Sequence, residues 1–578
     1  MIKYKNSKLY AALLLITVVS CSKLDEHLNS TLTNNQYAGA LGASGVSQLL
    51  GGAYQDLAVP FTNQDQVFSL EENTADESLV ATKGGDWDDN GVWRVLHNHT
   101  WNADHGQILS VFNNLNKMNF DATNVLAFKP SKQQTAEARF LRAVSLYYLL
   151  DLYGQYPVRN PGDNLLNAPV VKSGAIAAQF IVEELIAIIP DLPTARNAGQ
   201  ATQIAGKTLL MKTYLNRGAW ANRAAPTFAD ADMQQVITLG NSIITGGQLS
   251  YASNFFSNFD VNNGASTENI FTFVNNPGVA ANNSSPQARW CMTEHYNQET
   301  DYNPNAGWNG FSTISDFYNS FGTASTSMVG VTQFAAGNTN GLYADTAADS
   351  RIGGKFYPGV TNVSGQKVGF QIGQQFNEMG VALKDRKGNP LAFNPAISPD
   401  MKEVGGNLEV TGIRVVKYPP DFSNGTKNYE SNAGNDIVIF RYSDVVLMVA
   451  EAKLRAAAAD PAGALVLVNG LRAARGAAAL PSIKLVGSGT VVQTLYDPNA
   501  ILTERGRELY WESVRRTDLI RFGVETQLYQ YKPSDDPKYL VFPIPSQALA
   551  ANPNCFPHPH PLPHPLPRPT TPLTSQRA

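Results

Sequence analysis

A short acidic stretch near the N-terminal end of the chain carries two tryptophans. Residues 85–93 read GDWDDNGVW, so turn-forming and hydrogen-bonding residues surround both indoles. An indole can cover the apolar C–H face of a sugar ring, while carboxylates and amides bond its polar rim. Asp86, Trp87 and Trp93 are therefore candidate ligand-binding residues. The alternative is that one tryptophan packs this loop onto neighbouring helices.

A second group of aromatic residues lies between positions 290 and 311. Residues 307–310 read GWNG, which predicts a flexible turn that presents an indole. Core packing is the alternative for Phe311. The candidate ligand-binding residues in this group are Trp290, Tyr302, Trp308 and Asn309.

Metal binding has weaker support in the sequence. The clustered aspartates of the first stretch could hold calcium, which takes oxygen ligands. However, residues 86–91 (DWDDNG) lack the spacing and the bidentate glutamate of an EF-hand. His97, His99 and His105 are close in sequence, but no pattern of further ligands supports zinc. We therefore predict neither a metal site nor a cofactor.

Paired carboxylates can catalyse hydrolysis, and the sequence places Glu504, Glu508 and Glu512 four residues apart on one predicted helix face. Glycoside hydrolysis needs two carboxylates about 5–10 Å apart in a cleft. Arginines are interleaved with these glutamates, and Glu512 and Arg516 have the spacing of a helical ion pair. The pattern predicts a salt-bridge network. We therefore predict no catalytic residue and no enzymatic activity.

Composition limits the classes of partner. The chain has 578 residues, which predicts two to four domains or one large helical repeat body. Lysine and arginine number 44 and aspartate and glutamate 48, giving a net charge of −4. Without a basic excess to neutralise phosphates, a nucleic-acid partner is disfavoured. Charged residues make up only 16%, against about 25% in an average soluble domain, which suits neutral polar ligands.

The N-terminus has the pattern of an export signal. Lysines precede an apolar run over residues 9–19, and this run is shorter than the about 20 residues that span a membrane. The run ends Val18-Val19-Ser20-Cys21, which resembles the bacterial lipobox. We therefore predict a signal peptide over 1–20 and lipid attachment at Cys21. An ordinary signal peptide with an incidental cysteine is the alternative.

The body of the chain shows recurring helical periodicity. Residues 134–153 carry an apolar stripe at helical spacing, followed by Gly154 as a helix end and by Pro157. The helices come in pairs with short breaks, compatible with tetratricopeptide-like hairpins of roughly 34 residues. The same spacing predicts helices over 175–189, 203–217, 231–245, 440–457, 462–475 and 499–521.

Between about 250 and 435 the sequence becomes rich in Asn, Gly, Ser and Thr. Loops of this length are uncommon unless they carry function. We therefore predict a mainly α-helical protein with a loop-rich ligand-binding lobe. Its expected parts are an N-terminal helical repeat region (21–250), a C-terminal region that contains this lobe (251–554) and a proline-rich, disordered tail (555–578).

Several segments resemble one family in the right order. EARFLRAVSLYYLLDLYGQYPV (137–158) strongly resembles the signature helix of the SusD/RagB family, the surface lipoproteins of starch-utilisation-type nutrient uptake systems. After the Asn-Pro-Asn turn at 552–554 the chain departs from the family, with Cys555 and a proline tail that looks like a replaced terminus. The other similar segments are 201–220, 254–273, 437–456, 501–523 and 539–554.

The resemblance implies a tetratricopeptide-like scaffold with a loop-rich binding lobe. It implies a cell-surface protein, anchored in the outer membrane through Cys21, that forms a lid on a SusC-type TonB-dependent transporter. Such a protein captures an oligosaccharide, or in some relatives a peptide, and delivers it to the transporter without breaking a bond.

Two functions of other classes remain as alternatives. An outer-membrane glycoside hydrolase would need a convergent carboxylate pair near the aromatic loops, where only Asp86, Asp88 and Asp89 are candidates. A tetratricopeptide-like adaptor would bind only protein and would have no small ligand.

Overall fold

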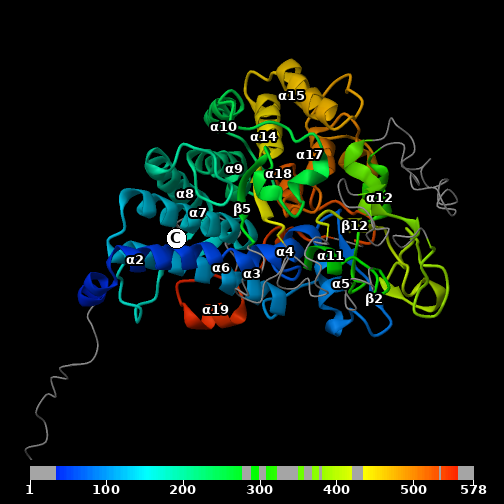
Figure 1. The fold of residues 1–578 in the computed structure, drawn as a ribbon, viewed down its shortest axis with the longest axis horizontal. Coiled ribbons are helices and arrows are strands. Elements are labelled where there is room, and N and C mark those ends of the chain that lie inside the picture. Colours follow the sequence, from blue (N-terminus) through cyan, green and yellow to red (C-terminus); the bar gives the residue numbers. More distant parts are fainter. Residues whose placement is uncertain are drawn as a thin grey trace, which may run out of the picture.

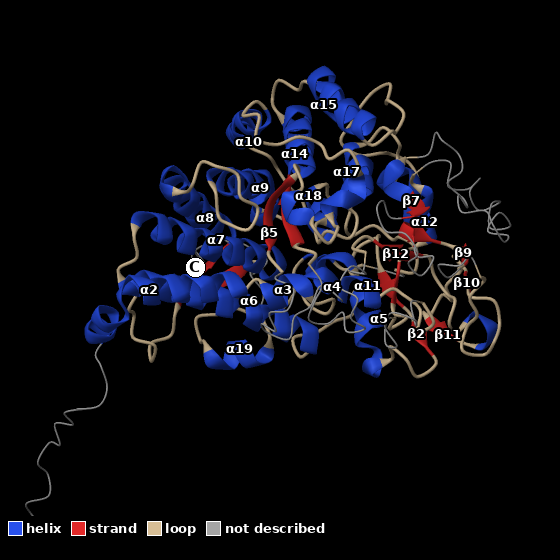
Figure 2. Ribbon diagram, viewed as in Figure 1, coloured by secondary structure: helices blue, strands red, loops and turns tan. Residues whose placement is uncertain are grey.

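Helices dominate the computed structural model and stack side by side over most of it, while short strands and loops gather at the right-hand end of the view (Figures 1 and 2). The predicted lipid site Cys21, the candidate Tyr302 and nearly all of the predicted tail lie outside the residues that the structure describes. Those residues are 34–275, 288–298, 307–321, 349–356, 367–375, 381–419, 434–532 and 535–557.

Long helices form the scaffold, and each packs against the next one along the chain. This arrangement confirms the predicted mainly α, hairpin-repeat architecture. The predicted helix over 203–217 extends four residues further, to Ala221. The scaffold helices of the first half are α2 (Asn34–Gln55), α6 (Gly106–Val125), α7 (Lys132–Tyr153), α8 (Gly174–Ile188), α9 (Gln203–Ala221) and α10 (Asp230–Ile244).

Helix α7 shows why the sequence signal was strong. Ser131 caps the helix by accepting a hydrogen bond from the Gln134 amide, and the Gln134 side chain bonds back to Ser131. Gly154 ends the helix with a positive φ of 68°, which glycine adopts without strain. Nearly every residue of α7 from Ala136 onward is buried, so this helix lies inside the stack rather than on its surface.

The helical stack continues into the C-terminal half. Helix α14 (Tyr442–Arg455) packs against both α10 and α15 (Pro461–Ala474). Asp460 caps α15 by accepting from the Gly463 amide, and Pro461 occupies the first helical position. Both helices confirm the predicted pair, and the two halves of the chain share one continuous scaffold.

The predicted long helix over 499–521 is wrong. The chain forms two helices, α17 (Ile501–Leu509) and α18 (Arg515–Arg521), with a break between them. Trp511 and Ser513 adopt positive φ angles of 59° and 61° in this break. No helix continues through such angles.

Contacts with the N-terminal half stabilise the break. The Ser513 amide donates to a Glu72 carboxyl oxygen at 2.6 Å, and the Trp511 amide donates to Glu77 at 3.3 Å. The Trp511 indole donates to the Glu77 backbone carbonyl at 3.1 Å. Tertiary hydrogen bonds therefore replace the intrahelical ones, and no local pattern in residues 499–521 predicts them.

The glutamates of α17 do form the predicted salt-bridge network. Glu508 accepts hydrogen bonds from Arg351, Arg441 and Arg475. The predicted partner of Glu512 was wrong: its carboxylate binds Arg441 and Lys417 instead of Arg516. The helix break removes the spacing on which the Glu512–Arg516 pair depended.

Short strands join the remaining segments. The antiparallel pair β5 (Asn269–Phe273) and β13 (Ile437–Arg441) ties the middle of the chain to the start of α14. The hairpin of β3 (Gln155–Val158) and β4 (Val170–Ser173) follows α7. The loop-rich lobe holds β1 (Leu79–Val80) with β6 (Phe311–Ser312), β2 (Thr82–Lys83) with β11 (Lys402–Glu403), β9 (Gly373–Gln374) with β10 (Ala392–Phe393), and β7 (Gly353–Phe356) with β8 (Lys367–Gln371) and β12 (Arg414–Val416).

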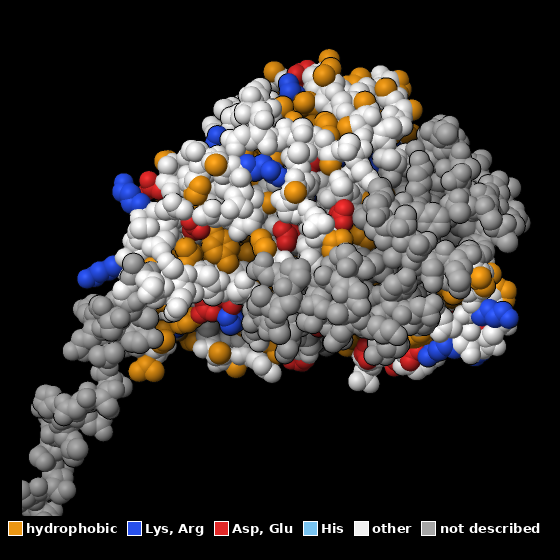
Figure 3. All heavy atoms as spheres, viewed as in Figure 1, with side chains coloured by type: hydrophobic (Ala, Val, Ile, Leu, Met, Phe, Trp, Pro, Cys, Tyr) orange, Lys and Arg blue, Asp and Glu red, His pale blue; other side chains and the backbone are white. Residues whose placement is uncertain are grey.

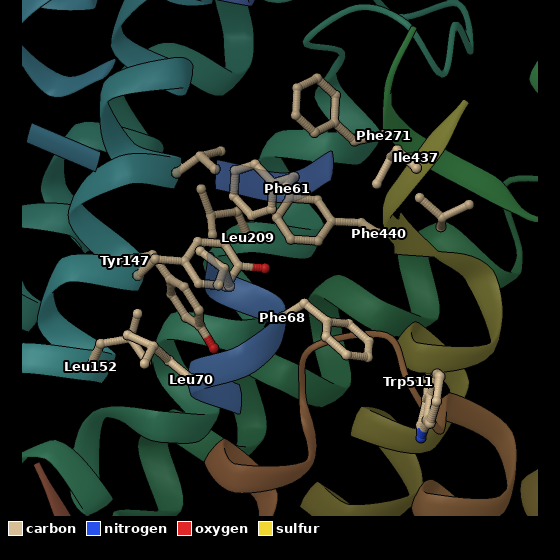
Figure 4. Close-up of a cluster of buried hydrophobic side chains, with 14 of the residues drawn as sticks. Phe61, Phe68, Leu70, Tyr147, Leu152, Leu209, Phe271, Ile437, Phe440 and Trp511 are labelled. Carbon is tan, nitrogen blue, oxygen red and sulfur yellow. The ribbon is translucent and has the colours of Figure 1, made fainter. Parts of the chain in front are cut away.

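One hydrophobic core unites these parts (Figure 4). Phe61 and Phe68 come from the N-terminal segment, Phe440 from β13 and Trp511 from the helix break. The Phe68 and Trp511 rings meet edge to face at 5.5 Å. The short helices around this core are α3 (Ala58–Thr62), α4 (Val67–Glu72), α5 (Val92–His97), α11 (Ala288–Cys291), α12 (Ser315–Asn319), α16 (Val491–Leu495) and α19 (Ser546–Ala551).

Two further observations concern anchoring and redox state. Among the described residues, no helix has both the length and the apolar character needed to cross a membrane. Cys291 and Cys555 are free thiols, the first buried and the second half-buried.

Candidate functional site

The loop between β2 and α5 holds the first predicted group. Trp87, Asp89 and Asn90 all adopt positive φ angles, between 40° and 61°. Such angles are uncommon outside glycine and mark a loop whose conformation is imposed by its contacts. Here the loop presents Asp86 and Trp87 at the surface, both half-buried.

Trp87 and Trp308 meet across the structure. The Trp87 indole N–H donates to the Trp308 carbonyl oxygen at 2.6 Å. The Trp87 ring also meets the Trp93 ring at 5.2 Å and the Phe311 ring at 5.6 Å, both edge to face. A Cβ at Gly310 would stand only 2.5 Å from the Trp87 ring, so glycine is required for this approach. The two predicted aromatic groups therefore form one cluster.

The GWNG turn is fixed, in contrast to the flexible turn that the sequence predicted. Its backbone amides at Trp308, Asn309 and Gly310 donate to carbonyl oxygens of residues 291–294 at 2.7–2.9 Å. Asn309 adopts a φ of 54°. The Trp308 side chain is half-buried on this clamped turn, so little entropy would be lost when a ligand covers it.

A polar rim borders the two indoles. Asp86 accepts a hydrogen bond from the Tyr296 hydroxyl at 2.6 Å and one from Arg386 at 3.3 Å. The Arg386 guanidinium lies over the Tyr296 ring, 3.9 Å from its centroid. Side chains of Asp86 and Arg386 are 46% and 48% exposed, so both retain surface for a ligand. We call Asp86, Trp87, Tyr296, Trp308 and Arg386 the candidate site.

Buried groups hold the polar rim in place. Glu409 accepts from the Arg386 side chain at 2.8 Å and lies 2.9 Å from the His295 ring nitrogen Nε2. Burial lowers the pKa of His295 to about 4, so its ring is neutral at neutral pH. Burial opposes ionisation of Glu409, but hydrogen bonds from Arg386 hold the pKa of this carboxyl below its usual range. Arg386 thus has a charged partner at neutral pH.

The Tyr296 hydroxyl remains a hydrogen-bond donor at all physiological pH values. Burial, together with the hydrogen bond to Asp86, raises the pKa of Tyr296 above its ordinary value. Its ring stays neutral and half-buried beneath Arg386. Tyr296 belongs to the aromatic group between 290 and 311 but was not among the predicted ligand-binding residues. Arg386 was missed, because nothing in the surrounding sequence KDRKGN marks one basic residue above the others.

Other predicted ligand-binding residues lie behind this surface. Trp93 is 5% exposed, and Trp290 and Asn309 are fully buried. The Trp93 indole N–H donates to Asp89 at 2.7 Å. The side-chain amide of Asn309 has no hydrogen-bond partner among the described residues, which makes it a group that a water or a ligand hydroxyl would satisfy. Ligand contact by these three residues stays a prediction, and their burial assigns them a supporting position.

The acidic residues of the first loop are individually engaged. Asp88 pairs with Arg94 at 2.9 Å, Asp89 accepts from Trp93, and Asp86 binds Tyr296 and Arg386. Within the described part of the chain, no cluster of three or more metal-ligating side chains is present. The arrangement offers aromatic faces and a polar rim for binding.

Comparisons with known proteins agree on one family. A sequence model of the SusD family matches residues 267–555. The starch-binding protein SusD of Bacteroides thetaiotaomicron is 25% identical over 529 residues, covering 84% of each chain. A SusD-like protein of Bacteroides ovatus is 26% identical over 137 residues, covering 23% of this chain and 25% of its own.

Solved structures share the fold. A laminarin-binding SusD-like protein superposes with a TM-score of 0.63 at 17% identity, covering 88% of this chain and 97% of its own. The surface glycan-binding protein A of Bacteroides thetaiotaomicron, in complex with laminarihexaose, gives 0.59 at 17% identity, covering 89% and 99%. The helical scaffold, the ordered segments and the match over half of the chain lead to the same conclusion: this protein belongs to the SusD family.

Proposed function

We propose that this protein captures an oligosaccharide at the candidate site. The observation that carries the proposal is the clamped pair of half-buried indoles, Trp87 and Trp308, beside the Asp86–Arg386 rim. The indoles would cover the apolar face of a sugar ring, and the rim would bond its hydroxyl groups. Relatives named for binding starch and laminarin support a glycan as the ligand class.

The finer parts of the proposal concern location and delivery. We propose that the chain is lipidated at Cys21, is displayed on the outer membrane, and passes its ligand to a SusC-type TonB-dependent transporter. The lipobox-like sequence at 18–21 and the family membership support this arrangement. The protein would bind without breaking a bond, since no carboxylate in the first loop is free of a fixed partner.

A binding array tests the proposal. The mature chain is applied to polysaccharides and peptides, and hits are repeated with Trp308→Ala and with Trp101→Phe as a buried control. We expect a glycan hit that Trp308→Ala weakens by roughly tenfold, the order of one lost aromatic contact. We expect Trp101→Phe to bind normally.

Other outcomes would replace the proposal. Reducing-end release from the bound polysaccharide would make the protein a glycoside hydrolase. A peptide-only hit would change the nutrient. Glycan binding unaffected by Trp308→Ala would move the site elsewhere, and a protein-only interaction would favour the adaptor function.

A further inference from the structure

The β3–β4 hairpin carries apolar side chains that face solvent. Leu165 and Leu166 stand at its tip with 62% and 93% of their surfaces exposed, and Val170 at the start of β4 is 64% exposed. Adjacent leucines with this exposure are costly in water, since each leaves apolar surface uncovered. Their position at a protruding tip points to a partner surface.

Hydrogen bonds within the hairpin loop hold the two leucines in their exposed positions. The Arg159 guanidinium donates to the backbone carbonyls of Asn164 and Asn167, at 3.2 and 2.7 Å. The Asn164 side chain accepts from the Leu166 amide at 2.9 Å. Asp163 accepts from the Asn160 amide at 2.7 Å. The tip is therefore held in one conformation that turns its leucines outward.

The hairpin lies at the end of the molecule where the described chain begins. A cavity of about 360 Å³ is lined by Leu126 and Pro130, which precede α7, and by residues 158–161 of the hairpin. Strand β3 thus runs back along α7 toward residues 126–130, and α2 packs against residues 126–128. Figure 1 shows the hairpin loop below α2, and Figure 3 shows hydrophobic side chains at that lower left corner.

The proposed lipid anchor belongs to the same end. Cys21 precedes Asn34, the first described residue, by 13 positions. A fully extended segment of that length spans at most about 45 Å. Acyl chains on Cys21 would therefore hold the start of α2 within about 45 Å of the membrane surface.

We propose that the hairpin tip at Leu165 and Leu166 inserts into the lipid surface beside the acylated cysteine. The anchor part of this inference rests on the proposed function. The acyl chains on Cys21 would tether the protein at one point, and apolar side chains that reach the acyl boundary would add a second membrane contact. The tip would thus fix the orientation of the tethered protein.

Brominated lipids, which quench nearby indoles, test the insertion. The full lipidated chain is reconstituted into phosphatidylcholine vesicles with or without dibrominated acyl chains. Leu166→Trp places a reporter at the tip. Val466→Trp is the matched control, because Val466 is 72% exposed on α15 at the opposite side of the scaffold. We expect loss of most of the emission added by Leu166→Trp and no loss for Val466→Trp.

The outcomes are separable. Equal quenching of both variants, or none, would overturn the inference. Self-association in solution that Leu166→Asp abolishes would make the tip a contact between copies and would also overturn it. Flotation of the vesicles reports separately on the anchor. If flotation fails, coupling Cys21 to a maleimide lipid in a Cys555→Ser background restores the tether, so the hairpin is tested in either case.

Discussion

Arginine and carboxylate side chains meet in two regions of this molecule with opposite consequences. Around Glu508, the side chains of Arg351, Arg441 and Arg475 are all at most 1% exposed. In the candidate site, Asp86 and Arg386 are each about half exposed. The buried pairs have exhausted their hydrogen-bonding capacity on one another, whereas the exposed pair keeps capacity for a ligand. Burial, rather than residue type, separates the structural cluster from the binding surface.

The buried and the exposed ion pairs also differ in how much they stabilise the fold. Burial opposes ionisation of Glu508, but three guanidinium groups hold the pKa of this carboxyl well below its ordinary value. Removing one partner of such a cluster leaves uncompensated charge in a medium where water cannot screen it. An exposed pair such as Asp86–Arg386 is worth at most about 1 kcal/mol, since water screens it.

The largest expected effect comes from breaking the buried cluster. Glu508→Gln keeps the side-chain shape but leaves Arg351, Arg441 and Arg475 without a shared negative partner, and we expect a loss of about 3–5 kcal/mol in unfolding free energy. Urea unfolding followed by circular dichroism measures it. Asp536→Asn, in an exposed pair with Lys538, is the control and should unfold as the parent does. A loss below about 1 kcal/mol for Glu508→Gln would remove the distinction between the two regions.

Glu525 gives a pH-dependent effect of the next size. This carboxyl is buried, its oxygens accept no hydrogen bond from described residues, and burial raises its pKa from 4.5 to about 8. Between these two values the unfolded chain ionises Glu525 while the folded chain keeps the proton. The stability that this group contributes is therefore present below pH 4.5 and is lost as pH rises toward 8.

Glu525→Gln isolates that term, because glutamine does not titrate. We expect the unfolding free energy of the variant, relative to that of the parent, to rise by about 1 kcal/mol per pH unit between pH 4.5 and 8. Denaturant unfolding at pH 5, 6.5 and 8 measures the difference, in which the titration of all other groups cancels. A difference that stays constant with pH would show that Glu525 is ionised in the folded protein.

The sequence predicted what depends on local periodicity. The apolar stripe of α7 and its end at Gly154 are local, so the scaffold helices could be placed within a few residues. The break at Trp511 could not be placed, because Glu72 and Glu77 that hold it lie more than 400 residues away. A periodic pattern carries no information about distant acceptors.

Prediction of the candidate site was divided in the same way. Trp87 and Trp308 were proposed from residue type and turn composition, and the structure joins them, while their contact with a ligand stays a prediction. Arg386 was not proposed, because its position depends on Tyr296 and Glu409, which neighbour it only in the fold. Trp93 and Trp290 have the same residue type as the half-buried indoles, and only the packing reveals that they are buried.

The two half-buried indoles should act as a unit. Trp87 donates its indole N–H to the Trp308 backbone carbonyl, so removing the Trp87 side chain releases the turn that presents Trp308. We expect Trp87→Ala and Trp308→Ala each to weaken glycan binding by roughly tenfold, and the double variant to lose clearly less than the product of the two. Isothermal titration with the glycan from the binding array measures the coupling. Fully multiplicative losses would mean that the two indoles contact the ligand independently.

The smallest expected effect concerns the exposed rim and its response to salt. Stacking and neutral hydrogen bonds are little affected by ions, whereas the half-exposed pairs of Arg386 are screened at high ionic strength. We therefore expect glycan affinity to fall by less than about threefold between 50 and 500 mM NaCl. Arg386→Gln should lower the affinity by a similar factor and remove the remaining salt dependence.

Salt and the Arg386→Gln substitution, applied together, show how the Arg386 contacts act. If the Arg386 contacts matter only by orienting Tyr296 and Asp86, then salt and the Arg386→Gln substitution act on the same interactions, and their effects should not add. Isothermal titration of the parent and of Arg386→Gln with the glycan, at both salt concentrations, gives the four affinities that this test compares. A tenfold or larger salt dependence that survives in Arg386→Gln would indicate a charged ligand, which a rim built for neutral sugars does not explain.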